Sequence, residues 1–231
     1  MSIAENVARI RREMEAAALS AGRDPKQIRL CAATKMNDTA AVRQAIAAGV
    51  DCCGENRVQE LVRKRSEGAY QGVPVHFIGR LQTNKVKQVV GAVDLIQSVG
   101  SERLLAAIDA EAKRKGLIQN ILLEINAAGE EAKTGFSFQE IPAILDQIGN
   151  FSNICARGFM TIPPISRNPG DNLQFFQKIY QLSVDIKGKK YDNVMVDCLS
   201  MGMSDDFVDA IRSGATMIRI GTAIFGPRNH T

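Results

Sequence analysis

Lys35 is the first residue of this sequence whose position points to chemistry. It directly follows the run Leu-Cys-Ala-Ala-Thr at 30–34, which is typical of a buried strand. Loss of solvation at the mouth of such a strand lowers the pKa of a lysine amine and frees the amine for imine chemistry. The alternative is an ordinary solvated lysine at a strand exit.

Arg219 is the second such residue, because it lies inside the apolar run 217–220. Side chains alternate along a strand, so the two isoleucines of this run are expected to face the helices, while Met217 and Arg219 point inward. A buried arginine keeps its proton and requires an acceptor or an anion. The alternative is a structural salt bridge to Glu124 or Asp197.

Two glycine-containing segments are candidates for an anion site. The segment Ser-Met-Gly at 200–202 precedes a predicted helix that Ser204 caps, and Gly221 with Thr222 follows the last apolar run. Glycine allows close approach of the backbone, hydroxyls donate hydrogen bonds, and helix N-termini favour negative charge. The alternative is two ordinary glycine turns.

The composition excludes several classes of protein. The chain has 231 residues, of which 45% are hydrophobic and 23% charged, which is ordinary globular usage. The net charge of +4 is spread along the chain in short basic clusters, which we interpret as solvated helix ends rather than a nucleic-acid site. No apolar run approaches the roughly 18 residues that cross a bilayer. The five cysteines predict buried reduced thiols in a cytoplasmic protein, and with two histidines we expect no metal site.

The chain alternates short apolar runs with amphipathic stretches. Each run is too short for a helix, and most are rich in Val, Ile or Cys, as strands buried on both faces are. The expected strands are 28–33, 50–53, 75–78, 93–96, 121–125, 154–160, 194–199 and 217–220.

The stretches between the runs carry the signals of helix ends. Ser2 and Glu5 form a capping-box pattern at the start of a first helix, which Gly22 terminates. Further helix starts are expected at Asp38, Ser101, Ser137 and Ser204.

Eight strand-then-helix repeats after one leading helix predict an α/β fold, a (β/α)8 TIM barrel with an extra N-terminal helix. No linker or composition break divides residues 1–231, so we expect a single domain. A doubly wound open sheet is the alternative. Polar residues and glycines cluster at the strand exits, which meet at one end of a barrel, and this fits a small polar ligand held there.

Six separated segments carry a resemblance to a known family. They are Lys35 after the first strand, GENRVQE at 54–60, HFIGRLQTNK at 76–85, RGFMTIP at 157–163, LSMGMSDD at 199–206 and RIGTAIFG at 219–226. In this order they resemble the pyridoxal-phosphate homeostasis protein family, which is similar to the barrel domain of bacterial alanine racemase. The resemblance covers essentially the whole chain.

The resemblance implies a cytosolic, single-domain barrel that holds pyridoxal 5′-phosphate (PLP) as an imine on Lys35. It also implies that Arg219 faces the pyridine nitrogen and that Asn56 lies beside the ring. The implied phosphate contacts are Ser200, Met201, Gly221 and Thr222, and the implied pocket-lining residues are His76 and Met160.

The sequence favours a carrier over a catalyst. An arginine has only donors, so beside the ring nitrogen it stabilises a carbanion weakly. Alanine racemase adds a tyrosine base from a second domain, whereas this sequence ends soon after the eighth strand, and Tyr70, Tyr180 and Tyr191 fall in predicted helices or linkers. We therefore expect a PLP reservoir or delivery protein in vitamin B6 and amino-acid homeostasis, without strong catalytic activity.

Two other activities stay open at this point. One is a slow PLP-dependent racemase or lyase that uses His76 or a bound water as its base, and the other is a lysine-imine aldolase without a cofactor. The expected partners are PLP and PLP-dependent apo-enzymes, with no nucleic acid and no membrane, and we expect a monomer. Lys133 is either a solvated loop residue or a contact for a second phosphate or a partner.

Overall fold

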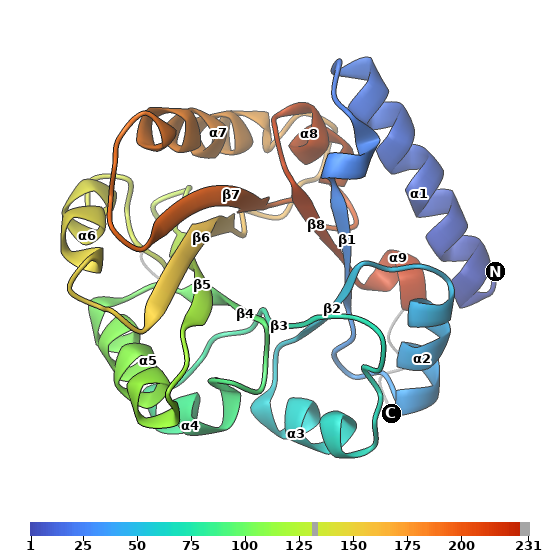
Figure 1. The fold of residues 1–231 in the computed structure, drawn as a ribbon. Helices are drawn as coiled ribbons and strands as arrows, with labels where there is room; N and C mark the ends of the chain where they lie inside the picture. Colours follow the sequence, from blue (N-terminus) through green and yellow to red (C-terminus); the bar gives the residue numbers. More distant parts are fainter. Residues whose placement is uncertain (131–133, 227–231) are drawn as a thin grey trace.

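The centre of the molecule is a closed barrel of parallel strands (Figure 1). The structure is a computed structural model that describes residues 1–130 and 134–226. The strands follow one another around the barrel in chain order, and pairing of the first with the last closes it. They are β1 (Arg29–Ala33), β2 (Cys52–Glu55), β3 (Val75–Phe77), β4 (Leu95–Val99), β5 (Gln119–Ile125), β6 (Ile154–Thr161), β7 (Val194–Ser200) and β8 (Met217–Ile220). The predicted TIM barrel is confirmed, and the open sheet is excluded.

Helices cover the outside of the barrel between successive strands, and one helix precedes them all (Figure 1). They are α1 (Ile3–Ser20), α2 (Thr39–Ala47), α3 (Val58–Ser66), α4 (Val86–Val89), α5 (Glu102–Lys115), α6 (Ile141–Ile148), α7 (Leu173–Lys187), α8 (Phe207–Arg212) and α9 (Thr222–Phe225), with the short 3-10 helices η1 (Pro25–Gln27) and η2 (Thr83–Lys85). The extra N-terminal helix packs against α2, α8 and α9, and the side-chain amide of Asn6 donates to the carbonyl of Ile224.

The predicted helix starts are largely confirmed by their hydrogen bonds. Ser2 and Glu5 form a capping box in which each side chain accepts from the other residue's amide. The side chains of Asp38 and Ser101 accept from amides in the first turns of α2 and α5. Gly116 ends α5 in the left-handed region, at φ 65°, where a side chain is disfavoured.

The prediction that Ser204 caps a helix is wrong. Helix α8 begins at Phe207, and a turn occupies the residues before it. The carboxylate of Asp206 accepts from the amide of Met203, at 2.7 Å, and so takes the role of closing this turn. The Ser204 hydroxyl instead accepts from the amide of Ala223, at 3.4 Å, and joins the β7 exit to α9.

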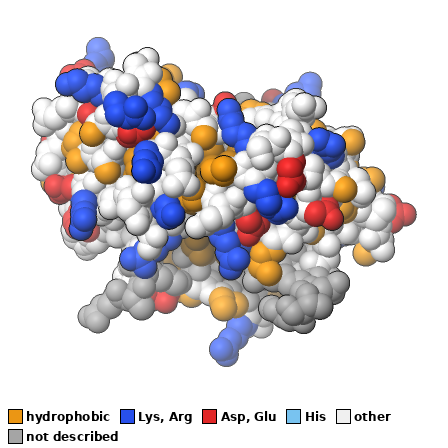
Figure 2. Space-filling view, turned by 90° about the horizontal axis from the view of Figure 1, so that it is seen from below, with side chains coloured by type: hydrophobic (Ala, Val, Ile, Leu, Met, Phe, Trp, Pro, Cys, Tyr) orange, Lys and Arg blue, Asp and Glu red, His pale blue; other side chains and the backbone are white. Residues whose placement is uncertain are grey.

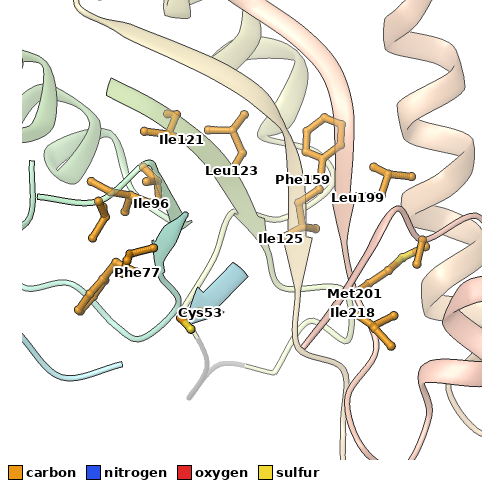
Figure 3. Packing of buried hydrophobic residues seen from close by; sticks show 14 of the residues in the cluster. Cys53, Phe77, Ile96, Ile121, Leu123, Ile125, Phe159, Leu199, Met201 and Ile218 are labelled. Atoms are coloured by element: carbon orange, nitrogen blue, oxygen red, sulfur yellow. The ribbon is translucent and has the colours of Figure 1, made fainter. Parts of the chain in front are cut away.

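Two apolar layers pack against the strands, one outside the barrel and one inside it. The larger lies between strands and helices and includes Phe77, Phe159 and Ile218, whose side chains point away from the barrel axis (Figure 3). The smaller, which we call the inner cluster, consists of Cys31, Cys52, Leu95, Leu122, Met160, Cys198 and Met217. The alternation predicted for β8 is confirmed, because Met217 belongs to the inner cluster and the two isoleucines to the outer layer.

Charged residues are interspersed over the outer surface. Figure 2 shows lysines and arginines scattered among acidic and hydrophobic side chains on the side seen from below in Figure 1. The basic triplet at 113–115 is exposed in the last turn of α5, as expected of a solvated helix end. In the described part of the chain, the helices are too short or too polar to cross a membrane. The five cysteines are free thiols, four buried and Cys155 half-buried.

Candidate functional site

A cavity of about 590 Å³ opens at the end of the barrel where the strands exit. This is the end that barrels of this type use for ligands. Its walls are Ala33, Lys35, Met36, Asn37, Asn56, Ile78, Gly79, Arg80, Ser98, Glu124, Thr134, Ile162, Met203, Ser204, Asp205, Arg219, Gly221, Thr222, Phe225 and Gly226. Five of the nine predicted site residues therefore lie together, from the exits of β1, β2 and β8.

Lys35 lines this cavity from the end of β1, and its neighbours in the chain are held on both sides. The carbonyl of Thr34 accepts from the ammonium of Lys64, at 2.7 Å. The amide of Met36, which has a left-handed φ of 62°, donates to the carboxylate of Glu60, at 2.7 Å. The backbone that carries Lys35 is thus anchored from outside the barrel, by side chains of α3.

These anchors belong to a buried network, which we call the Lys64 cluster. Lys64 is fully buried, and its ammonium lies 2.7 Å from a carboxylate oxygen of Glu55 and 3.2 Å from one of Glu60. The hydroxyls of Thr34 and Tyr70 donate to the same oxygen of Glu55. Burial and the nearby Glu55 carboxylate together raise the pKa of Tyr70. Lys64 and Glu55 compensate each other's charge in a place that water does not reach, although the second carboxylate oxygen of Glu55 has no hydrogen-bond partner in the described residues.

Asn56 presents an unsatisfied polar atom at the cavity wall. Its side-chain Oδ1 is buried and accepts no hydrogen bond from the described residues. Gly79 lies against the backbone of Asn56 so closely that a Cβ at position 79 would overlap it. Buried amide oxygens rarely lack a donor, so this one marks a place for a ligand.

Arg219 forms the floor of the cavity and is held by the barrel itself. Its Nη1 donates to the carbonyl and hydroxyl of Ser200, both at 2.7 Å, and its Nη2 donates to the carbonyl of Thr161, at 2.9 Å. Burial lowers the pKa of this guanidinium. The alternative of a salt bridge is not supported, since Asp197 pairs with Arg157, and Glu124 accepts from Thr134.

Glu124 is a further ionisable residue of the cavity, at the end of β5. Its side chain is 8% exposed, and Oε1 accepts from the hydroxyl of Thr134, at 3.1 Å. Burial raises the pKa of this carboxyl, although the hydrogen bond and the charges of Arg219 and Arg80 oppose the rise. A carboxyl with a raised pKa that faces a cavity is a candidate for proton transfer.

The other four predicted residues lie away from the cavity wall. Met160 belongs to the inner cluster, and Met201 is fully buried in the outer apolar layer. Ser200 lies beneath Arg219, and its hydroxyl donates to the amide oxygen of Gln97, at 2.6 Å. His76 is deeper still and lines a second cavity at the opposite end of the barrel. Lys133 lies outside the described residues.

The sequence contained weak signals for the residues that were missed. Lys64 stands four residues after Glu60, a spacing that pairs side chains on a helix, but it is also the centre of the polar run 63–65. A basic run of this kind is typical of the solvent-exposed face of a helix. Only the fold brings Glu55 from β2 across to this position on α3.

The chain resembles proteins of one named family along almost its whole length. The family model described as alanine racemase, N-terminal domain, matches residues 2–229. A protein of Aquifex aeolicus named pyridoxal phosphate homeostasis protein is 37% identical over 230 residues, which cover 100% of both chains. One of Escherichia coli with the same name is 34% identical, with 99% of this chain and 98% of that one covered.

Solved structures of two other proteins have a similar fold. PipY of Synechococcus elongatus, solved with PLP bound, is 30% identical with a TM-score of 0.83, and the match covers 97% of this chain and all of PipY. Alanine racemase of Streptomyces lavendulae shares the fold, with a TM-score of 0.74 at 14% identity, and the match covers 97% of this chain and 58% of the racemase.

Proposed function

Because this chain belongs to the alanine racemase N-terminal domain family and, within it, to the pyridoxal phosphate homeostasis proteins, we propose that it binds PLP through Lys35 and acts as an intracellular reservoir for this cofactor. The observation that carries the proposal is the cavity in which an amine, an unsatisfied amide oxygen and a buried guanidinium face one space. PLP supplies an aldehyde that forms a reversible imine with a primary amine, and an anionic phosphate.

The donors around the cavity fit this cofactor. Lys35 supplies the amine on the β1 side, and Gly221, Thr222 and Ser204 offer backbone amides and hydroxyls for a phosphate on the β7–β8 side. Arg219 lies between them on the floor. Of the residues expected at the phosphate, Ser200 would act from below by orienting Arg219, whereas the amide of Met201 donates to the carbonyl of Met217 and is not directed at the cavity.

Arg219 disfavours carbanion chemistry. A guanidinium has only donors, so beside a ring nitrogen Arg219 would donate to its lone pair and would not supply the negative partner that keeps that nitrogen protonated. In the described part of the chain, the cavity wall contains no tyrosine. The hydroxyl of Tyr70 donates to Glu55 on the outer face of the strands. We infer that the protein stores the aldehyde and releases it to other amines, including those of PLP-dependent apo-enzymes.

One observation favours a second activity, a slow PLP-dependent racemase or lyase. Glu124 faces the cavity with a raised pKa, so it could hold the proton that such a reaction moves. His76, which the sequence suggested as this base, lines the opposite cavity and not this one. Glu124 is therefore the better candidate for the base.

Borohydride reduction of the purified protein tests the reservoir. We expect a yellow, PLP-loaded protein in which reduction fixes the cofactor on the peptide that contains Lys35. Lys35→Ala should lose the colour, whereas Lys178→Ala, which removes an exposed lysine of α7, should keep it. A protein that stays colourless with added PLP, or a label on another lysine, would refute the proposal.

The second activity has its own measurement. Chiral chromatography of alanine and other amino acids after prolonged incubation with the loaded protein detects racemisation, and pyruvate assays detect a lyase. Turnover that Glu124→Gln lowers by about 100-fold or more, with the colour retained, would establish a catalyst. No turnover above that of free PLP would establish the carrier.

A further inference from the structure

Two thiols and an imidazole meet inside the barrel, one layer below the cavity. Cys31 of β1 and Cys52 of β2 are partners in the strand register, and His76 of β3 lies beside them. Their ligand atoms all lie within 4.8 Å of one another, and their exposed fractions are 0%, 1% and 3%. Three soft donors from three adjacent strands thus converge on one point, which the separate sequence positions did not predict.

We propose that Cys31, Cys52 and His76 bind one thiophilic metal cation of the Zn²⁺ or Cu⁺ type. Thiolate and imidazole are the preferred ligands of such ions, and three protein ligands are enough for either of them. Around a tetrahedral Zn²⁺ with bonds of about 2.3 Å, two sulfur atoms lie about 3.8 Å apart. The ligand atoms observed here, all within 4.8 Å of one another, have separations of this order.

Charge balance favours a cation here. Binding through two thiolates releases both thiol protons to solvent, and the bound cation neutralises the negative charges that are left. Arg219 is a further fixed positive charge that acts on Cys31. Two thiolates, this guanidinium and Cu⁺ sum to zero, and Zn²⁺ leaves one positive charge, which a hydroxide from bound water neutralises.

His76 is already oriented by a second residue. The amide nitrogen of Gln97 lies 2.9 Å from Nδ1, which leaves Nε2 for the cation. Metal-bound histidines usually donate their other N–H to an oxygen, and rotation of the Gln97 amide supplies one. After that rotation the amide nitrogen of Gln97 faces Ser200. The Ser200 hydroxyl oxygen can then accept hydrogen bonds from both Gln97 and Arg219.

An entry path from the opposite end of the barrel is also present. A second cavity of about 160 Å³ opens at the end of the barrel where the strands begin, and His76 and Cys198 form part of its wall. Two carboxylates, Asp94 and Asp197, and two guanidinium groups, Arg29 and Arg157, line the same cavity, and Arg157 pairs with Asp197. The path is therefore separate from the cavity that holds Lys35.

Metal analysis of two matched variants tests the proposal. The protein without PLP is equilibrated under reducing conditions with Zn²⁺ or with Cu⁺, desalted, and measured by mass spectrometry of the metal. We expect about one equivalent of at least one cation. Cys52→Ala should weaken binding more than about 100-fold, because even loss of an outer partner of a ligand costs 10–100-fold. Cys53→Ala removes the neighbouring thiol, which lies in the outer apolar layer, and should bind normally.

A spectrum of the unaltered protein covers the case in which Cys52→Ala fails to fold. Co²⁺ in place of Zn²⁺ should give an intense thiolate-to-cobalt band in the near ultraviolet and the visible bands of a tetrahedral ion. Binding of neither Zn²⁺ nor Cu⁺, equal loss in Cys53→Ala, or a cobalt spectrum without the thiolate band would each overturn the proposal. These readouts use no PLP, so they are independent of the function proposed above.

Discussion

Strands β1 and β2 carry opposite kinds of polar chemistry on their two faces. On the outer face, the Lys64 cluster pairs a buried ammonium with two carboxylates and closes the hydrogen bonds of Thr34 and Tyr70. On the inner face, Asn56 leaves an oxygen unsatisfied, and Cys31 and Cys52 stand beside an imidazole. The outer groups bind one another through one oxygen of Glu55, whose other oxygen has no partner, whereas on the inner face the Asn56 oxygen faces the cavity and the thiols and imidazole contact one another.

This difference shows how a buried polar group can be assigned a role. A charge that is fully compensated by its neighbours adds little affinity for anything else, and removing one member leaves the others exposed to a large desolvation cost. A donor or acceptor without a partner has already incurred that cost, so a ligand that satisfies it binds more tightly. The predictions below separate the two faces by these opposite responses.

The largest effect is expected on the outer face. Lys64→Met leaves the Glu55 carboxylate buried without its cation, so we expect the free energy of unfolding to fall by about 3–5 kcal/mol. Urea unfolding measures this change. Lys87→Met, which removes an exposed lysine of α4, should stay within about 0.5 kcal/mol of the parent. A loss below 1 kcal/mol for Lys64→Met would show that the cluster is not a structural unit.

A loss of comparable size is expected at the cavity floor. Arg219→Met removes the donors to two buried carbonyls, those of Ser200 and Thr161, and each unsatisfied group of this kind costs about 1–3 kcal/mol. The same urea experiment, without PLP, reports it. Arg219→Lys keeps a positive charge and should recover part of the loss. An unchanged midpoint in Arg219→Met would mean that these hydrogen bonds do not hold the floor.

Asn56 should respond in binding and not in stability. Asn56→Ala removes an oxygen that has no partner in the empty cavity, so unfolding without PLP should change by less than about 0.5 kcal/mol. Its affinity for PLP, measured by equilibrium dialysis, should fall about five-fold, which corresponds to one neutral hydrogen bond of about 1 kcal/mol. Asn150→Ala, an exposed residue after α6, should leave both quantities unchanged.

The smallest effect is a pH dependence at Glu124. Burial raises the pKa of this carboxyl, so its protonated form is favoured in the folded state, and the stability it contributes at low pH is lost as the pH rises through the folded-state pKa. Glu124→Gln should therefore match the parent below about pH 4.5 and be slightly more stable at neutral pH. Glu15→Gln, on the exposed face of α1, should show no such crossover. Parallel stability curves for Glu124→Gln and the parent would contradict the assignment.

Much of the fold could be predicted from periodicity and end signals. Short apolar runs gave all eight strands, and the alternation around Arg219 placed its side chain inside the barrel. The failure at Ser204 has a local cause, since Asp206 competes for the same turn through a stronger, charged acceptor. The sequence around 204–206 offers two residues that could cap a turn, and the contact of Asp206 with the amide of Met203 decides between them.

The site could be predicted only in part, because the sequence of a single strand does not fix the level of its side chains along the barrel axis. The tilt and stagger of the strands decide which residues share a layer. His76 precedes a strand exit by two residues, yet it lies level with Cys31 and Cys52, and the rim at that exit belongs to Ile78 and Gly79. Lys64 was hidden for a related reason, since its partner Glu55 comes from another element.

The pairing of β1 with β8 also governs how the chain can fold during synthesis. Strand β1 leaves the ribosome early, whereas β8, its partner along one edge, is synthesised nearly at the end. Helix α1 likewise lacks α8 and α9, which cover part of its apolar stripe, until the same late stage. At translation rates of about 5–20 residues per second, this interval lasts roughly 10–40 s. For that time the nascent chain has a bare sheet edge beside an uncovered helix, and both must be kept from neighbouring chains.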